Sequence, residues 1–203
     1  MIRPSEKIIP VRDQIADQLR SDIISGELAP GTKLNEQGLA TRFGVSRGPI
    51  RDVLLQLTKE GLLVTKSNVG ASVNEMLSPS LQKLMIDIRR RIEAYAVKQL
   101  KGQLTDEDFE ALDYFLERFK AAFEEGDFTE VTKADIEFHK FLVEKAGGQE
   151  LVNLWYPVVL RMRMNYKRID TPKDGVAEHQ SIIHALRDGD VKRAAKALKA
   201  NIR

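Results

Sequence analysis

Three side chains in the second half of the chain have the types and the spacing needed to bind a divalent metal ion. Asp135 and His139 are four residues apart, so a helix would present both on one face. His179 comes from a later helical stretch, and a carboxylate with two imidazoles from facing helices can hold a divalent cation. Because histidines lie on helices for many other reasons, this spacing leaves both metal binding and ordinary packing open.

A second group of side chains, in the first third of the chain, has the chemistry to contact nucleic acid. Arg47 and Arg51 are four residues apart and share one helix face. The apolar residues of the same stretch repeat on a different face: Ile50, Val53, Leu54 and Leu57. A short helix that buries one side and presents arginines from its N-terminal turns suits reading of the DNA major groove. An ordinary helical hairpin with surface arginines would show the same pattern, so this stretch alone does not decide.

Two short helices and a tight turn must position these arginines. The first helix is predicted over residues 36–43 with Leu39 inward, and Gly44 ends it because glycine adopts a left-handed conformation without steric cost. Ser46 is a favourable N-cap for the second helix, and Pro49 falls in its first turn, where no backbone donor is lost. The stretch therefore predicts a helix-turn-helix.

The residues on either side of this motif extend it. A helix is predicted over residues 11–26 before it, and two short β-prone runs, 62–65 and 71–73, follow it. Helices followed by a β-hairpin are the order of a winged helix-turn-helix. The tip of the wing, near Asn68 and Gly70, would lie along the sugar–phosphate backbone or in the minor groove.

The motifs that run through this head are specific in their order: 23–31, Leu34, Glu36, 39–40, 44–47, 49–51 and 57–62. With them, residues 11–75 resemble the DNA-binding domain of the GntR family of bacterial transcription regulators. The resemblance implies that double-stranded operator DNA is contacted by the following residues: Gln37, Ser46, Arg47, Gly48, Arg51, Lys66, Asn68 and Gly70. Many members of the family have arginine at the position of Gln37 and threonine at that of Gly48, so we expect fewer phosphate contacts or a different operator.

The chain changes character near residue 76. Residues 1–75 are predicted to form the winged helix-turn-helix domain, and residues 76–203 a second domain. The second domain shows six helical patterns and no strand pattern: 81–100, 105–126, 127–146, 150–169, 176–187 and 190–203. The predicted fold class is therefore mainly α, with an all-α antiparallel helical bundle after the head.

The second domain also carries ordered motifs: Arg89 with Glu93, 135–139, 178–179, Ala185, 189–190, 194–195 and Leu198. They resemble the FCD domain, the effector-binding module of the FadR-like subfamily of GntR regulators. The resemblance implies that Asp135, His139 and His179 are three ligands of a divalent metal such as zinc or nickel. Asn201 stands where metal-binding members have a fourth, histidine ligand, and an amide oxygen binds such metals more weakly than imidazole. Water or a carboxylate of the effector would complete the coordination shell.

Three further residues of the bundle are candidates for binding an acidic effector. The resemblance implies that Arg89 reaches into the bundle and pairs with the acid, whereas its spacing fits equally an ion pair with Glu93 on the same helix. Arg161 and Asn165 are four residues apart, so they share a helix face and could both contact the acid.

Composition limits what the protein can be. The 203 residues carry a net charge of +2, so DNA binding has to come from a local patch and not from general basicity. No cysteine is present, which excludes disulfides and thiol chemistry. No run approaches the ~20 apolar residues of a membrane span. We expect a cytoplasmic protein without a membrane partner.

Three hypotheses follow for the function. The leading one is a ligand-responsive transcription regulator that binds palindromic DNA as a homodimer and responds to a small organic acid, with metal assistance where the site is loaded. The second is a metal-dependent helical enzyme fused to a DNA-binding head, with Glu178 as its single candidate general base. The third is a DNA-binding dimer whose bundle only dimerises. The sequence names neither the effector, the metal, the operator nor the sign of regulation.

Overall fold

The computed structural model describes residues 9–66, 70–165 and 172–203. The chain divides into two compact units, Met1–Met76 and Leu77–Arg203. In the described ranges, every helix is too short or too polar to cross a membrane.

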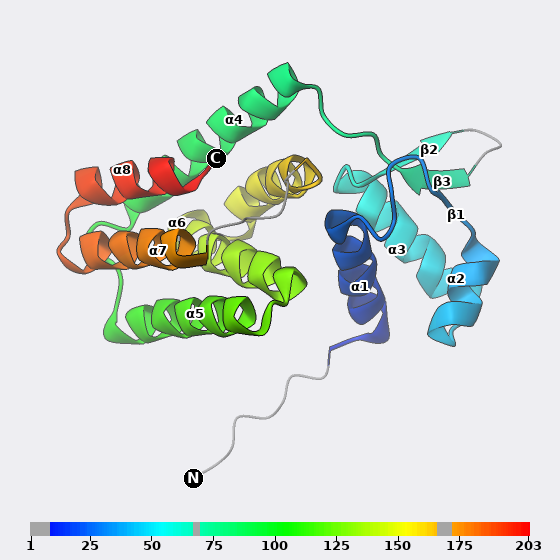
Figure 1. The fold of residues 1–203 in the computed structure, drawn as a ribbon, viewed down its shortest axis with the longest axis horizontal. Coiled ribbons are helices and arrows are strands. Elements are labelled where there is room, and N and C mark those ends of the chain that lie inside the picture. Colours follow the sequence, from blue (N-terminus) through cyan, green and yellow to red (C-terminus); the bar gives the residue numbers. More distant parts are fainter. Residues whose placement is uncertain (1–8, 67–69, 166–171) are drawn as a thin grey trace, which may run out of the picture. The chain divides into compact units, whose positions relative to one another are not determined.

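The first unit combines three helices with a small sheet (Figure 1). Its elements are α1 Val11–Ser25, β1 Lys33–Leu34, α2 Glu36–Phe43, α3 Arg47–Lys59, β2 Leu63–Lys66 and β3 Gly70–Val73. The three strands are antiparallel in the order β1-β3-β2. The winged helix-turn-helix is confirmed, and β1 is an addition, because two residues are too few to show a strand pattern in the sequence.

The apolar stripe of α3 forms the centre of this unit. Ile50, Val53 and Leu57 are fully buried, and both α1 and α2 pack against α3. Gly44 ends α2 with φ 65°, as predicted. Ser46 is the N-cap residue of α3, as predicted, and its hydroxyl makes no capping hydrogen bond within the described residues.

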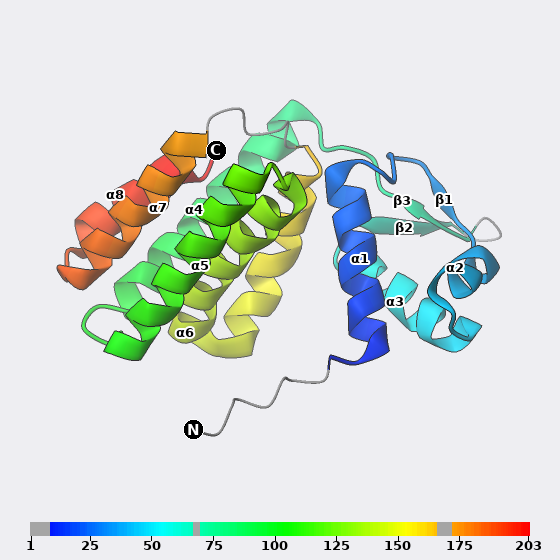
Figure 2. The same cartoon turned by 60° about the horizontal axis from the view of Figure 1, so that its bottom comes forward.

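The second unit is a helical bundle (Figure 2). Its helices are α4 Pro79–Gln99, α5 Asp106–Glu125, α6 Phe128–Arg163, α7 Pro172–Arg187 and α8 Val191–Asn201. Helix α6 packs against α4 and α5, while α7 and α8 pack on each other and reach α5 and α4 respectively. The predicted all-α bundle is confirmed. Its apolar core contains residues from each helix: Val97, Leu112, Phe138, Met162, Ile182 and Leu198.

Helix α6 contains the break that separates two of the predicted helices. The backbone is non-helical at Gly147 and at Gly148, which has φ 61° and ψ −161°. A Cβ atom at Gly147 would lie 2.7 Å from the Cβ of Leu151, so a larger residue would collide there. The glycine pair therefore makes the sharp turn between the two halves of α6.

Helix α7 begins earlier than the pattern predicted. Pro172 is its first residue, four positions before the predicted start at Val176. Proline is tolerated there because the first helical residue has no partner for its missing N–H. At the start of α5, Thr105 and Asp108 form a capping box, since the side chain of each bonds the other's backbone N–H.

Candidate functional site

Arg47 and Arg51 lie on the solvent-facing side of α3, in its first two turns. Their side chains are 53% and 60% exposed, whereas Ile50 between them is fully buried. The predicted separation of a charged face from an apolar face is therefore present. The helix N-terminus itself adds positive partial charge beside these guanidinium groups, which favours an anionic partner.

A carboxylate of α2 holds both guanidinium groups. Glu36 Oε2 accepts hydrogen bonds from Arg51 Nε at 2.7 Å and from Arg47 Nη2 at 3.0 Å. These bonds lower the pKa of Glu36. Sequence reasoning missed this role, because Glu36 precedes the arginines by 11 and 15 residues on another helix and no periodicity links them.

Most of the other residues predicted to contact DNA are exposed, and two lie wholly or partly outside the described residues. Gln37, Ser46 and Gly48 are exposed on the same helix-turn-helix, and a Cβ at Gly48 would meet nothing within 4 Å. Gly70 is exposed at the start of β3 with φ 84°. Lys66 ends β2, but its side chain, like the whole of Asn68, lies outside the described residues.

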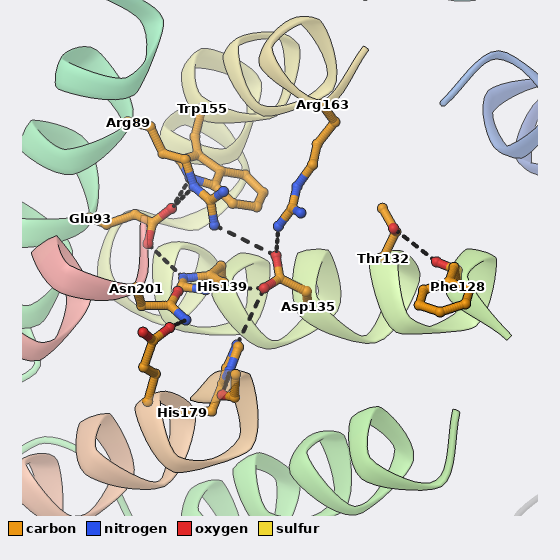
Figure 3. Close-up of polar contacts among 12 residues, drawn as sticks. Arg89, Glu93, Phe128, Thr132, Asp135, His139, Trp155, Arg163, His179 and Asn201 are labelled. Atoms are coloured by element: carbon orange, nitrogen blue, oxygen red, sulfur yellow. Dashed lines mark hydrogen bonds and ion pairs between the residues drawn. The ribbon is translucent and has the colours of Figure 1, made fainter. Parts of the chain in front are cut away.

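In the bundle, the three predicted metal ligands converge. One ligand atom from each of Asp135, His139 and His179 lies within 4.8 Å of the other two, and all three residues are buried. His179 Nε2 is 3.4 Å from Asp135 Oδ1, and His139 Nε2 is 3.9 Å from the same oxygen (Figure 3). Asp135 and His139 lie on α6 and His179 on α7, as the spacing predicted.

Both histidines are held through their other ring nitrogen. His139 Nδ1 lies 2.6 Å from Glu93 Oε2, and His179 Nδ1 lies 2.8 Å from the carbonyl oxygen of Gly175. Each acceptor fixes the Nδ1–H tautomer, and the two Nε2 atoms have no hydrogen-bond partner among the described residues. Metal-binding histidines are held in this way, with one nitrogen on an acceptor and the other free for the ion. The donor set therefore fits a divalent cation.

Glu93 is the centre of the buried polar network behind His139. Its Oε1 accepts hydrogen bonds from Arg89 Nε at 2.6 Å and from Trp155 Nε1 at 2.7 Å (Figure 3). Burial opposes ionisation of Glu93, but its interactions with Arg89 and His139 outweigh burial and lower the pKa to about 2. Burial and the nearby charge of Arg89 lower the pKa of His139, although Glu93 and Asp135 act to raise it. The network therefore keeps His139 neutral, which is the form that binds a metal.

Asp135 divides its two oxygens between different partners. Oδ2 accepts a hydrogen bond from Arg163 and lies 3.8 Å from Arg89 Nη2, whereas Oδ1 faces the two histidines. Burial opposes ionisation of this carboxyl group, but Arg163 and its other polar neighbours hold the pKa well below the usual range. Asp135 is therefore a carboxylate whose Oδ1 faces the Nε2 atoms of both histidines.

The predicted fourth ligand and the predicted effector contacts have other partners. Asn201 Nδ2 donates to Glu178 Oε2 at 3.2 Å. Arg161 Nη1 contacts Met164 Sδ at 3.0 Å. Asn165 bonds the backbone of Leu77 through both atoms of its amide.

Arg163, and not Arg161 or Asn165, contacts Asp135 of the candidate metal site. Arg89 also lies near Asp135, as predicted. Arg163 was missed because a stretch with arginines at alternate positions does not show which of them faces the core. Arg89 takes part in the ion pair with Glu93 that its spacing also allowed.

Comparisons with known proteins place both units. The chain matches the FCD domain over residues 84–203 and the bacterial regulatory proteins of the gntR family over residues 11–73. The HTH-type transcriptional repressor RspR of Escherichia coli (strain K12) is 30% identical over 192 residues, covering 91% of this chain and 84% of the relative. The gluconate operon transcriptional repressor of Bacillus licheniformis is 27% identical over 197 residues, covering 93% and 80%. The solved structure of E. coli McbR/YncC has the same fold, with a TM-score of 0.82 at 21% identity over 96% of this chain and 94% of that one.

Proposed function

Because the chain belongs to the GntR family of bacterial regulatory proteins and is a DNA-binding transcription regulator with an FCD domain, we propose that it binds palindromic operator DNA as a homodimer and responds to a small organic acid held with the help of a divalent metal. Within the family, its FCD domain motifs favour the FadR-like subfamily. The sensor part rests on one observation: two Nε2 atoms that have no hydrogen-bond partner among the described residues converge with one carboxylate oxygen in a buried site.

The DNA-reading part is assigned to the N-terminal turns of α3. Arg47 and Arg51 are exposed there, and Glu36 fixes the directions of both guanidinium groups. Preoriented guanidinium groups on a helix that enters the major groove can bond guanine edges or phosphates. Gln37, Ser46 and Gly48 would flank this contact. Lys66, Asn68 and Gly70 of the wing would add contacts to the sugar–phosphate backbone.

The homodimer is supported by an apolar stripe on α4. Leu81, Leu84 and Tyr95 are 46%, 50% and 50% exposed, and their spacing of 3 and 11 residues puts them on one helix face. A second copy of the chain is the partner that a palindromic operator requires, since a two-fold DNA site is matched by a two-fold protein. Covering this stripe would remove three large apolar side chains from water.

The sensor site combines a cation site with two guanidinium groups. Asp135, His139 and His179 would hold the metal, and Asn201, whose Nδ2 donates to Glu178, would coordinate through Oδ1. Arg89 and Arg163 are balanced by Glu93 and Asp135, so a bound divalent cation leaves the cluster net positive. A carboxylate reduces this positive charge, and it can bond the metal and an arginine at the same time. The metal would thus supply an electrophilic anchor for the acid.

The enzyme alternative has little support. Its candidate general base, Glu178, is engaged by Asn201 and Arg203. The relatives are transcription regulators, so catalysis is not needed to explain the buried cluster.

Gel shifts with the DNA upstream of the protein's own gene test the proposal. We expect Arg47→Ala to weaken binding by about 1–3 kcal/mol while the protein stays folded, as for a base- or phosphate-contacting arginine. Lys59→Ala is the control, since Lys59 is an exposed cation at the other end of α3. Equal binding by the Arg47 variant and the wild type would refute the DNA-reading assignment.

A further inference from the structure

The segment between the last strand of the first unit and the first helix of the second is held by two asparagine side chains. Asn74 Nδ2 donates to the carbonyl oxygen of Gly61 at 3.0 Å. Asn165 Oδ1 accepts from Leu77 N at 2.8 Å, and its Nδ2 donates to the Leu77 carbonyl oxygen at 2.7 Å. Glu75 and Met76, the residues between these anchors, are exposed. Asn165 therefore holds the linker at Leu77.

Asn165 follows the C-terminal end of α6, and this end of the helix contacts the candidate metal site. Arg163 precedes Asn165 by two residues, and its guanidinium group bonds Asp135 Oδ2. The carbonyl oxygen of Met162 accepts a hydrogen bond from Gln82 Nε2 on α4 at 3.2 Å. Residues 162–165 thus join the carboxylate that would bind the cation to the start of α4 and to Leu77.

We propose that Asn165 is a positioning residue that couples occupancy of the candidate metal site, by cation and acid, to the conformation of the linker at Leu77. The proposal rests on the proposed function, because it concerns how the sensor acts on the DNA-binding unit. A cation on Asp135 Oδ1 withdraws charge from the carboxylate and adds positive charge close to Arg163. An acid anion on the metal offers Arg163 a second partner. Either change weakens the bond between Arg163 and Asp135. The backbone of residues 162–165 then changes conformation, and Asn165 with it.

The chemistry of Asn165 suits this role. A side-chain amide that both accepts from a backbone N–H and donates to the C=O of the same residue fixes that residue in one conformation. Aspartate would keep the acceptor but lose the donor and place a charge against the Leu77 carbonyl oxygen. Alanine would remove both bonds. Because Leu77 is half-buried while Met76 and Ser78 are exposed, the backbone at Leu77 depends on these two bonds.

The experiment compares wild-type protein with Asn165→Ala, using Ni²⁺ alone as the probe. Hydrogen–deuterium exchange is followed on peptides covering residues 74–81, and operator affinity is measured with and without Ni²⁺. Asn153→Ala is the matched control, because Asn153 lies on the half of α6 that leads to Asn165 and its side chain bonds only Gln149 among the described residues. His139→Ala, which removes a metal ligand, shows what Ni²⁺ does without the site. Should the alanine variant fail to fold, Asn165→Asp takes its place.

We expect Ni²⁺ to change exchange at residues 74–81 in the wild type and in Asn153→Ala, and to shift operator affinity about fivefold or more. Asn165→Ala should bind Ni²⁺ within about threefold of the wild type but lose the response, with a ratio of operator affinities near one. A merely structural role would lower stability without removing the response.

Wild-type exchange that is the same with and without Ni²⁺ would overturn the proposal, as would an Asn165→Ala protein that keeps the wild-type response. Operator binding by the wild type without metal reports on the proposed function separately.

Discussion

Replacing Glu93 by glutamine should weaken metal binding although Glu93 is not a ligand. Its Oε2 lies 2.6 Å from His139 Nδ1, so the carboxylate fixes the tautomer and the ring orientation that direct Nε2 toward Asp135. Glutamine keeps the size of the side chain but removes the charge, and its NH₂ group can face the ring instead of the oxygen. Losing such a partner costs about 10- to 100-fold in metal affinity. This corresponds to about 1.4–2.8 kcal/mol.

The variant has a second consequence that has to be separated from the first. Arg89 bonds the same carboxylate and is itself buried, so Glu93→Gln leaves a buried cation without its main counter-charge. Removing one partner of a buried ion pair typically costs about 3–5 kcal/mol of stability. The double variant Arg89→Met with Glu93→Gln removes both charges together and should fold more stably. Its metal affinity should remain lowered, because His139 still lacks the carboxylate.

Isothermal titration with Ni²⁺ and Zn²⁺ measures the effect, with thermal unfolding as a check that each variant is folded. Glu137→Gln is the control, since Glu137 is on the same helix as His139 but pairs with Arg118 at the surface. If folded Glu93→Gln protein bound both metals as tightly as the wild type, the assigned role of Glu93 would be wrong.

Three further predictions concern the dimer, the break in α6 and the DNA-reading arginines. Leu84→Glu should convert a dimer into monomers in light scattering, because it places a charge in the exposed stripe of α4; a variant that stays dimeric would place the interface elsewhere. Gly148→Ala should lower the free energy of unfolding in urea by about 1–3 kcal/mol, since φ 61° with ψ −161° is a glycine conformation; no loss would mean that the break tolerates a side chain. Glu36→Gln should reduce discrimination between operator and unrelated DNA, because Arg47 and Arg51 lose the charge that fixes them, while affinity for unrelated DNA rises; sharper discrimination would contradict this.

Local patterns in the sequence determined most of what could be predicted. The four-residue spacings of Arg47 with Arg51 and of Asp135 with His139 place each pair on one helix face without knowledge of the fold. Gly44 as a helix stop and Ser46 as an N-cap act within one turn of a helix, so their residue types suffice to predict these positions. The helix-turn-helix and the helical bundle follow from such local signals.

Contacts between residues far apart in the sequence could not be predicted by the same reasoning. His139 is joined to Glu93 across 46 residues and Trp155 to Glu93 across 62, and only the packing of α4 against α6 brings them together. The same holds for Asn165, whose partner Leu77 is 88 residues away. Its spacing from Arg161 indicated a shared face but not what that face meets. Side-chain type predicts what a residue can bond, whereas the partner depends on the fold.

Methylation protection of guanine N7 tests the central assignment most directly, because an arginine in the major groove covers that atom. Operator DNA bound by the wild type should show protected guanines in two half-sites about one helical turn, or a multiple of it, apart. Arg51→Ala should lose protection at one guanine in each half-site. Binding without any protected guanine N7, or a protection pattern unchanged in Arg51→Ala, would contradict major-groove reading by α3.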